Sequence, residues 1–342
     1  MKRLLPLLLA ALLLLLVCAA CSSGARTEDP WEPYRQTMRP ATQGYLDGLD
    51  LLPVYDLRVT LNADRSRLAG IQTVRFPNTT SDTLPEVVFR LYPNMPRFGG
   101  RMDVQSVQVN GVPVDYEYNV SETALEVRLP TPLESEKVAE LRLTYAVRIP
   151  RSEANYVLFG ATDEFVSLPY FYPMLALRDA QGWHRSIAPT YADASSAAAA
   201  LYNVSFTGPA DLRLVAPGTL ISHTVAAEGQ ATWQYRSGPI REFMFIGSPA
   251  FQSVEEQVGD VAVRSWFLPG DGEAGRAALV HAVAALRVYQ QWFGPYPYPE
   301  VAVVQAPLGH HGMEFPHVNL IGGDLYRERR DELEYLVVHE VA

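Results

Sequence analysis

Alternation of apolar and polar residues is the strongest pattern in this chain, and it runs from about residue 54 to residue 251. One run is apolar at every second position: Tyr55, Leu57, Val59 and Leu61. This period of two recurs over 125–129 and 141–149, and it is typical of strands that bury one face. We expect further strands at 67–77, 86–92, 201–207, 212–216, 231–236 and 242–247. Many short strands separated by turns predict a β-sandwich or a saddle-shaped pair of sheets.

Asn110-Gly111 predicts a two-residue hairpin between strands at 107–109 and 112–114, because both positions of that turn need positive φ. After Phe251 the periodicity changes. A strand-like run at 261–267 is followed by an alanine-rich segment, 272–293, with apolar residues at helical intervals. Two more strand-like runs follow, and the pattern therefore changes from all-β to mixed α and β.

The last residues, 331–342, predict a helix with one apolar face. Its apolar residues recur at helical spacing: Leu333, Leu336, Val337 and Val341. Asp331 and Glu334 have the spacing of a capping box, so we expect the helix to start at Asp331.

Composition excludes some classes of function. The chain of 342 residues has a net charge of −10 and no block of Lys or Arg, so nucleic acid is not an expected partner. Cys18 and Cys21 are the only cysteines. The sequence after them therefore contains neither a disulfide framework nor a cysteine-ligated metal site.

Residues 1–20 have the features of a signal peptide, with Lys2 and Arg3 before the apolar run 4–17. This run is too short to span a bilayer permanently. Ala20-Cys21 resembles a bacterial lipoprotein processing site, after which Cys21 would carry lipid; ordinary secretory cleavage nearby is the alternative. We expect an exported protein, anchored by lipid to a bacterial cell membrane and facing the periplasm or the exterior. The polar, unpatterned residues 21–52 are expected to be a tether.

His339-Glu340 begins the pattern H-E-x-x-H on the predicted last helix. In that pattern two histidines on one helical face bind zinc, and the glutamate acts as a general base. The chain ends at Ala342, and the second histidine would be the next residue. Without other evidence, an incidental His-Glu pair near a helix end is the simpler interpretation.

A second motif precedes that helix. Gly312-Met313-Glu314 lies between two strand-like runs. It resembles the G-x-M-E-N edge strand of the aminopeptidase N family of zinc metallopeptidases, and 165–174 and 201–207 resemble parts of that family's β domain. The resemblance implies a mainly β N-terminal sandwich or saddle domain at 53–251, followed at 252–342 by the first α+β lobe of a thermolysin-like catalytic domain, which is incomplete.

The resemblance also implies roles for individual residues. His339 would be a ligand of Zn²⁺, and Glu340 would be the general base for the water that attacks the peptide carbonyl. Glu314 would hold the free α-amino group of the peptide substrate, and Met313 and Gly312 would offer backbone groups to it.

Two positions depart from the family motif, because His311 replaces its first glycine and Phe315 replaces its asparagine. Adjacent histidines on a strand point to opposite faces, so we do not expect His310 and His311 to share a metal. We expect these two residues and His317 at the surface or in a cleft.

Two functions from different classes remain open at this stage. The first is the N-terminal portion of an exported zinc aminopeptidase. As written, that portion would be inactive, because the second zinc histidine, the glutamate ligand and the catalytic tyrosine are missing. The second is a non-catalytic lipoprotein whose β domain has a binding or scaffolding role.

Overall fold

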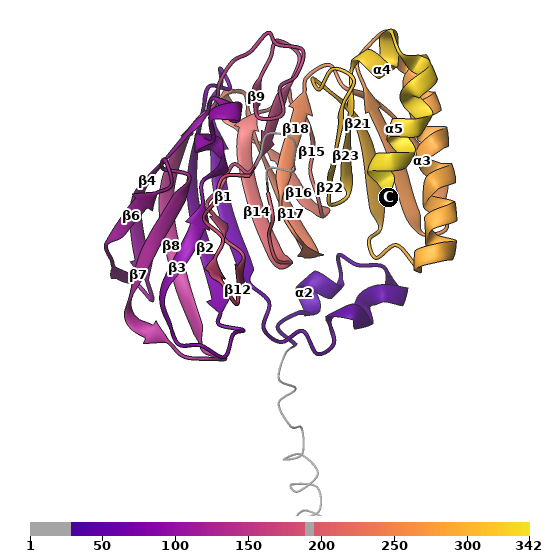
Figure 1. Ribbon diagram of the computed structural model, residues 1–342. Helices are drawn as coiled ribbons and strands as arrows, with labels where there is room; N and C mark the ends of the chain where they lie inside the picture. The colour runs from indigo at the N-terminus through magenta and orange to yellow at the C-terminus, as the bar shows by residue number, and fades with distance from the viewer. Residues whose placement is uncertain (1–28, 189–194) are drawn as a thin grey trace, which may run out of the picture. The chain divides into compact units, whose positions relative to one another are not determined.

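Eight strands form the largest sheet of the computed structural model, which describes residues 29–188 and 195–342 (Figure 1). Their spatial order is β16 (Thr219–Val225), β17 (Gln230–Ile240), β14 (Ala200–Pro209), β1 (Val54–Leu61), β2 (Arg67–Pro77), β8 (Val138–Arg148), β4 (Arg101–Val109) and β5 (Val112–Pro113). β1 pairs in parallel with β14, and the other neighbours pair antiparallel. The expected signal peptide and Cys21 lie outside the described residues.

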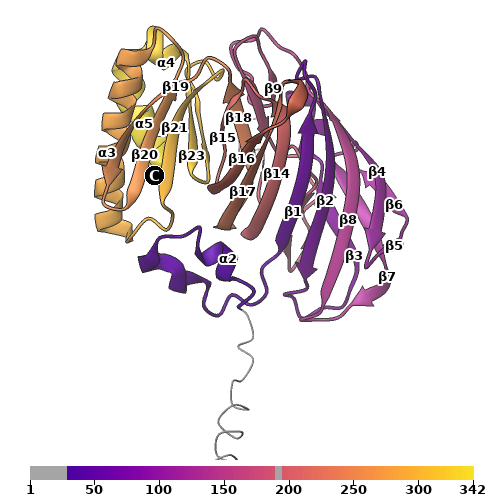
Figure 2. The ribbon, with the colours of Figure 1, turned by 180° about the vertical axis from the view of Figure 1, so that it is seen from behind.

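Smaller sheets complete the β domain. One has the order β11 (Met174–Leu175), β3 (Leu84–Arg90), β7 (Ala124–Leu133) and β6 (Tyr116–Asn119). Another has the order β15 (Arg213–Val215), β18 (Met244–Ser248), β10 (Val166–Pro169) and β9 (Gly160–Ala161). β12 (Arg178–Asp179) and β13 (Gly182–Trp183) form a separate hairpin. Figure 2 shows β1, β2 and β8 side by side from the opposite direction.

A five-stranded sheet follows in the sequence. Its order is β19 (Gln252–Val258), β20 (Val261–Phe267), β21 (Glu300–Ala306), β23 (Val318–Gly322) and β22 (Gly312–Phe315). The helices of this part are α3 (Gly272–Phe293), α4 (Asp324–Arg327) and α5 (Leu333–Val341). The remaining helices of the described residues are short: α2 (Glu32–Arg35) and the 3₁₀ turns η1 (Pro40–Leu46), η2 (Tyr92–Asn94), η3 (Pro96–Phe98), η4 (Ala227–Gly229) and η5 (Arg330–Glu332). A mainly β region followed by an incomplete α+β lobe is the predicted fold class, which is confirmed.

The packing explains why this architecture forms. One hydrophobic core joins the inner faces of the β domain to residues of the five-stranded sheet such as Phe315 and Leu320. A second core lies between that sheet and the helices α3 and α5, and includes Val263, Leu279 and Val337. The hydrophobic packing is therefore continuous where the chain passes into the five-stranded sheet at residue 252, and Tyr34–Ala342 form one compact unit.

Most strand predictions agree with the structure, and the hairpin at Asn110-Gly111 is confirmed by φ values of 50° and 79°. The segment 34–52 differs from the expected tether. Leu46 is fully buried, and Thr42 Oγ1 donates a hydrogen bond to the Pro297 carbonyl at 2.7 Å. The predicted capping box is wrong, because α5 begins at Leu333 and has no side-chain cap.

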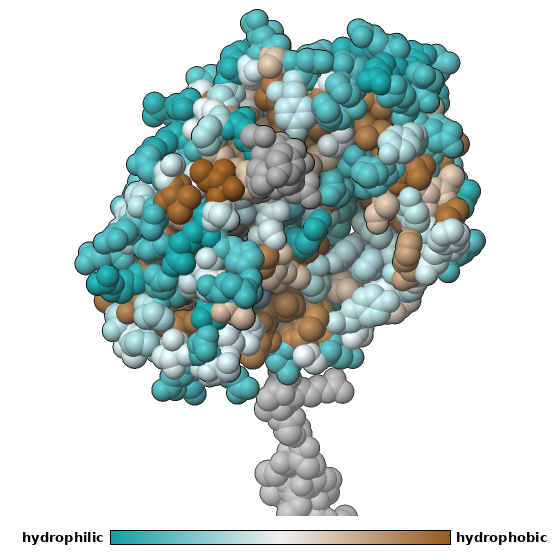
Figure 3. Space-filling view, viewed as in Figure 1, coloured by the Kyte–Doolittle hydropathy of each residue, from teal (hydrophilic) through white to brown (hydrophobic). Residues whose placement is uncertain are grey.

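On the face shown in Figure 3, hydrophobic residues occur in small groups among hydrophilic ones. None of the helices in the described part of the chain is long and apolar enough to cross a membrane.

Candidate active site

The candidate site is built on β22, which carries the Gly312-Met313-Glu314 motif. This strand is the last of its sheet and pairs only with β23, with Gly312 opposite Ile321 and Glu314 opposite Asn319. The strand is therefore an edge strand, as the family resemblance implied, and no strand among the described residues pairs with its other edge.

Alternate residues of β22 project to opposite faces of the sheet. Met313 and Phe315 pack against the core of the β domain, and the ring centroid of Phe315 lies 5.8 Å from that of Tyr170. Burial of Phe315 at this position explains how the chain accommodates an apolar side chain where the family motif has asparagine. Gly312 and Glu314 project to the other face, on which α5 lies.

Gly312 allows the carboxyl group of Glu340 to approach the strand closely. A Cβ atom added at Gly312 would lie 2.2 Å from Oε1 of Glu340 and 2.4 Å from its Cδ. Glu340 is only 6% exposed, so its carboxyl group occupies a position that any larger side chain at residue 312 would fill. The two motifs found in the sequence therefore meet in space.

Helix α5 is fixed in this position by contacts on two sides. Leu333 and Val337 are buried in the core between α5 and the sheet. From α3, the Tyr289 hydroxyl donates a hydrogen bond to the Val338 carbonyl at 3.0 Å. Figure 1 shows α5 alongside α3 next to the five-stranded sheet. The backbone of Glu340 is therefore positioned by packing of the residues before it.

His339 differs from Glu340 in that its side chain is exposed. Its imidazole lies 6.1 Å from the Tyr335 ring, nearly parallel to it, at a surface depression that Tyr289 also lines. The accessible imidazole is suited to be one ligand of a zinc ion, and the buried carboxyl group next to it is suited to be the general base. Across residues 29–188 and 195–342, no group of three His, Cys, Asp or Glu side chains could hold a metal ion.

His310 and His311 do not point to opposite faces as expected. They lie in the turn before β22, and their ring centroids are 4.0 Å apart. The edge of the Tyr156 ring faces His311 at 5.5 Å. Desolvation and the neighbouring His310 lower the pKa of His311. The prediction about the direction of the two side chains is wrong, because it assumed an extended backbone at these residues. The predicted exposure of both residues at the surface is confirmed.

His317 is buried, and its expected place at the surface or in a cleft is therefore wrong. It lies in the turn between β22 and β23, where it has a φ of 65°. The Gly218 N–H donates a hydrogen bond to its Nδ1 at 3.0 Å, and its ring lies 4.0 Å from the Tyr298 ring. Burial lowers its pKa to about 3. Pro316-His317 between two strands signals a turn, but no sequence pattern signals the contact with Gly218.

Solved structures with a similar fold are known. The structure is similar to an M1 zinc metallopeptidase from Deinococcus radiodurans, with a TM-score of 0.57 and 22% identity over 85% of this chain. A mutant of that enzyme bound to a Tyr-Ser-Ala substrate gives a TM-score of 0.54 at 22% identity over 83% of this chain. The chain spans 62–63% of the length of these two structures. No family model matches the sequence, and no curated protein matches it.

Proposed function

We propose that this chain supplies the N-terminal β domain and part of the catalytic centre of an exported, zinc-dependent aminopeptidase. The observation that carries the proposal is the contact between Gly312 and the Glu340 carboxyl group. It joins the strand motif and the helix motif, although each alone is short enough to occur by chance. Similarity of fold to M1 zinc metallopeptidases supports the same assignment.

Glu340 is the general base in this proposal. Its carboxyl group is held against the edge strand, where a peptide paired with that strand would place its carbonyl group within reach. His339 offers an imidazole nitrogen to the metal, and a catalytic zinc ion would need further protein ligands beside it. Bound zinc would lower the pKa of water and polarise the carbonyl group.

Glu314 is proposed to set the aminopeptidase specificity. It lies on the same face of β22 as Gly312, two residues further along the strand, and it is half-buried. A carboxylate there can pair with the ammonium group that only the first residue of a peptide carries. The unpaired edge of β22, including the backbone of Gly312 and Met313, can form hydrogen bonds with an extended peptide.

The location of the enzyme is proposed from the sequence alone. Residues 1–20 support export, and Cys21 supports attachment of lipid and anchoring to a bacterial membrane. Peptides are the proposed substrates, and the lack of a basic block argues against nucleic acid as a partner.

The test of this proposal is Glu314→Ala in the full-length gene product. Loss of one partner from a desolvated charge pair costs about 2–5 kcal/mol. The kcat/KM for peptides with a free amino group should therefore fall roughly 30-fold to several-thousand-fold. The cleavage rate of N-acetylated peptides should hardly change, because they have no ammonium group.

Glu117→Ala is the matched control, since Glu117 is an exposed glutamate on β6, in a different sheet from β22. It should leave both rates unchanged. If Glu314→Ala leaves the ratio of the two rates unchanged, the aminopeptidase assignment is wrong, even if the protein is a zinc peptidase.

A further inference from the structure

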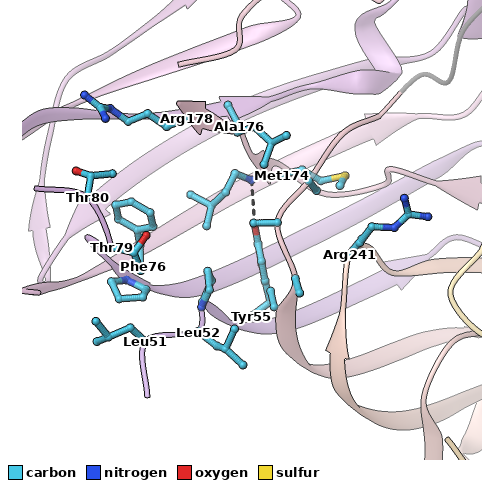
Figure 4. A pocket seen from close by; sticks show the side chains of 18 of the residues that line it. Leu51, Leu52, Tyr55, Phe76, Thr79, Thr80, Met174, Ala176, Arg178 and Arg241 are labelled. Carbon is cyan, nitrogen blue, oxygen red and sulfur yellow. Dashed lines mark hydrogen bonds between the residues drawn. The ribbon is translucent and has the colours of Figure 1, made fainter. Parts of the chain in front are cut away.

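The β domain contains a cavity that the proposed peptidase chemistry does not use. It lies where the end of the eight-stranded sheet meets the sheet that contains β3 and β11, and has a volume of about 320 Å³. Figure 4 shows its wall, to which β1 contributes Tyr55, β2 contributes Phe76 and β11 contributes Met174. A volume of this size is in the range of pockets for small molecules.

The sequence explains why the space is open. Four consecutive alanines, 197–200, line one side, where larger side chains would fill the gap between the sheets. Larger apolar side chains, including Leu52 and Phe76, also line the cavity. The hydroxyl group of Tyr55 already accepts a hydrogen bond from the Leu175 N–H at 2.9 Å. The interior therefore suits an apolar group better than a polar one.

Two arginines lie at the rim, on opposite sides of the apolar wall, with their guanidinium groups directed outward (Figure 4). Arg178 forms an ion pair with Asp82 at 2.7 Å. Arg241 is exposed, and within the described residues no carboxylate forms an ion pair with its guanidinium group. One positive charge at the mouth of the cavity is therefore available to a ligand.

We propose that this cavity binds a straight-chain amphiphile with one anionic head group, such as a medium-chain fatty acid. The tail would fill the space between the sheets, and the carboxylate would lie at the rim near Arg241. This proposal does not rest on the proposed peptidase function.

The volume sets the length of the tail. A volume of about 320 Å³ equals that of roughly ten water molecules in the liquid. One methylene group needs about the volume of one water molecule, so the cavity has room for a tail of roughly ten carbons. Each methylene buried should tighten binding about fourfold, so decanoate, with two more methylenes, should bind roughly 15-fold more tightly than octanoate. The gain should stop at longer chains, because additional carbons extend into water.

The experiment is a calorimetric titration of the purified chain with octanoate, decanoate, tetradecanoate, decanol and decyltrimethylammonium. Decanoate should bind about tenfold more tightly than decanol, because a carboxylate forms a charge-assisted hydrogen bond with arginine. Arg241→Gln should reduce decanoate binding to the level of decanol, and Arg241→Lys should retain most of it. Arg142→Gln changes an exposed arginine of β8 that does not line the cavity, and should have no effect.

A second variant tests the site of binding. Ala199→Phe places a large ring at the alanine side of the cavity and should weaken decanoate binding at least tenfold, with circular dichroism confirming that the variant is folded. The proposal is overturned if decanoate shows no saturable binding, or if decanol or the cation binds as tightly as decanoate. Unchanged binding to folded Ala199→Phe would equally overturn it.

Discussion

The buried His317 should make the fold sensitive to acid. Because burial lowers its pKa from 6.5 to about 3, the folded protein keeps this ring neutral at pH values where the unfolded chain binds a proton. The free energy of unfolding should therefore fall as the pH decreases from about 6.5 toward 3. Above pH 6.5 the contribution of His317 is fully present.

The magnitude follows from the difference between the two pKa values. Each pH unit below 6.5 costs about 1.4 kcal/mol, so acidification from pH 7 to pH 5 should remove roughly 2 kcal/mol. The cost arises because a second proton would have to displace the hydrogen bond from the Gly218 N–H to Nδ1. The ring would also carry its charge against the face of Tyr298, in a site closed to water.

Urea unfolding of wild type and His317→Gln at pH 7 and pH 5 measures this effect. Glutamine does not titrate and has an oxygen that can accept from Gly218. The variant should lose roughly 2 kcal/mol less than wild type between the two pH values, whatever its stability at pH 7. His281→Gln on α3 is the control and should retain the wild-type difference. If His317→Gln and wild type lose the same stability on acidification, the inference about His317 is refuted.

Three further outcomes are expected. Gly312→Ala places a Cβ against the Glu340 carboxyl group and should destabilise the chain by about 1–3 kcal/mol in urea unfolding, whereas Gly323→Ala, whose nearest neighbour would be 3.6 Å away, should be nearly neutral. Asp271→Ala removes the acceptor of a buried hydrogen bond from Gln305 Nε2 at 2.7 Å and should cost about 1–3 kcal/mol by the same measurement. The purified 342-residue chain should release no amino acid from an aminoacyl anilide in a chelator-sensitive way, since catalytic zinc needs three protein ligands.

Periodicity in the sequence predicted the elements that bury one face. β2 and α3 occupy the predicted ranges 67–77 and 272–293, because their apolar residues repeat with the period of their own backbone. β16 and β19 were not predicted. Most of their residues are exposed, so neither strand shows the alternation of apolar and polar residues that burial of one face produces.

Packing over long sequence separations could not be predicted in the same way. Residues 34–52 form short turns without periodicity, and their burial depends on contacts with Tyr296 and Pro297. The burial of His317 depends likewise on Gly218 in the β domain. Residue types alone do not specify such contacts.

The candidate site was partly predictable. The family resemblance implied an edge strand at Gly312-Met313-Glu314, and the apolar periodicity predicted that His339 and Glu340 lie on the last helix; the structure agrees with both. The requirement for glycine at 312 becomes evident only when the Glu340 carboxyl group is seen against it. The prediction for His310 and His311 assumed an extended backbone, whereas the two residues lie in a turn. Two identical residues carry no apolar or polar alternation from which that turn could be predicted.

The most direct test of the central claim is zinc content together with peptide turnover in the full-length gene product, its Glu340→Gln variant and its His339→Ala variant. Glutamine preserves the size of the side chain next to Gly312, so Glu340→Gln should retain zinc while turnover falls about 10²–10⁴-fold with loss of the base. His339→Ala should lose both zinc and activity. A wild-type protein without zinc, a Glu340→Gln variant that still turns over peptides at the wild-type rate, or a His339→Ala variant that retains zinc would contradict the account.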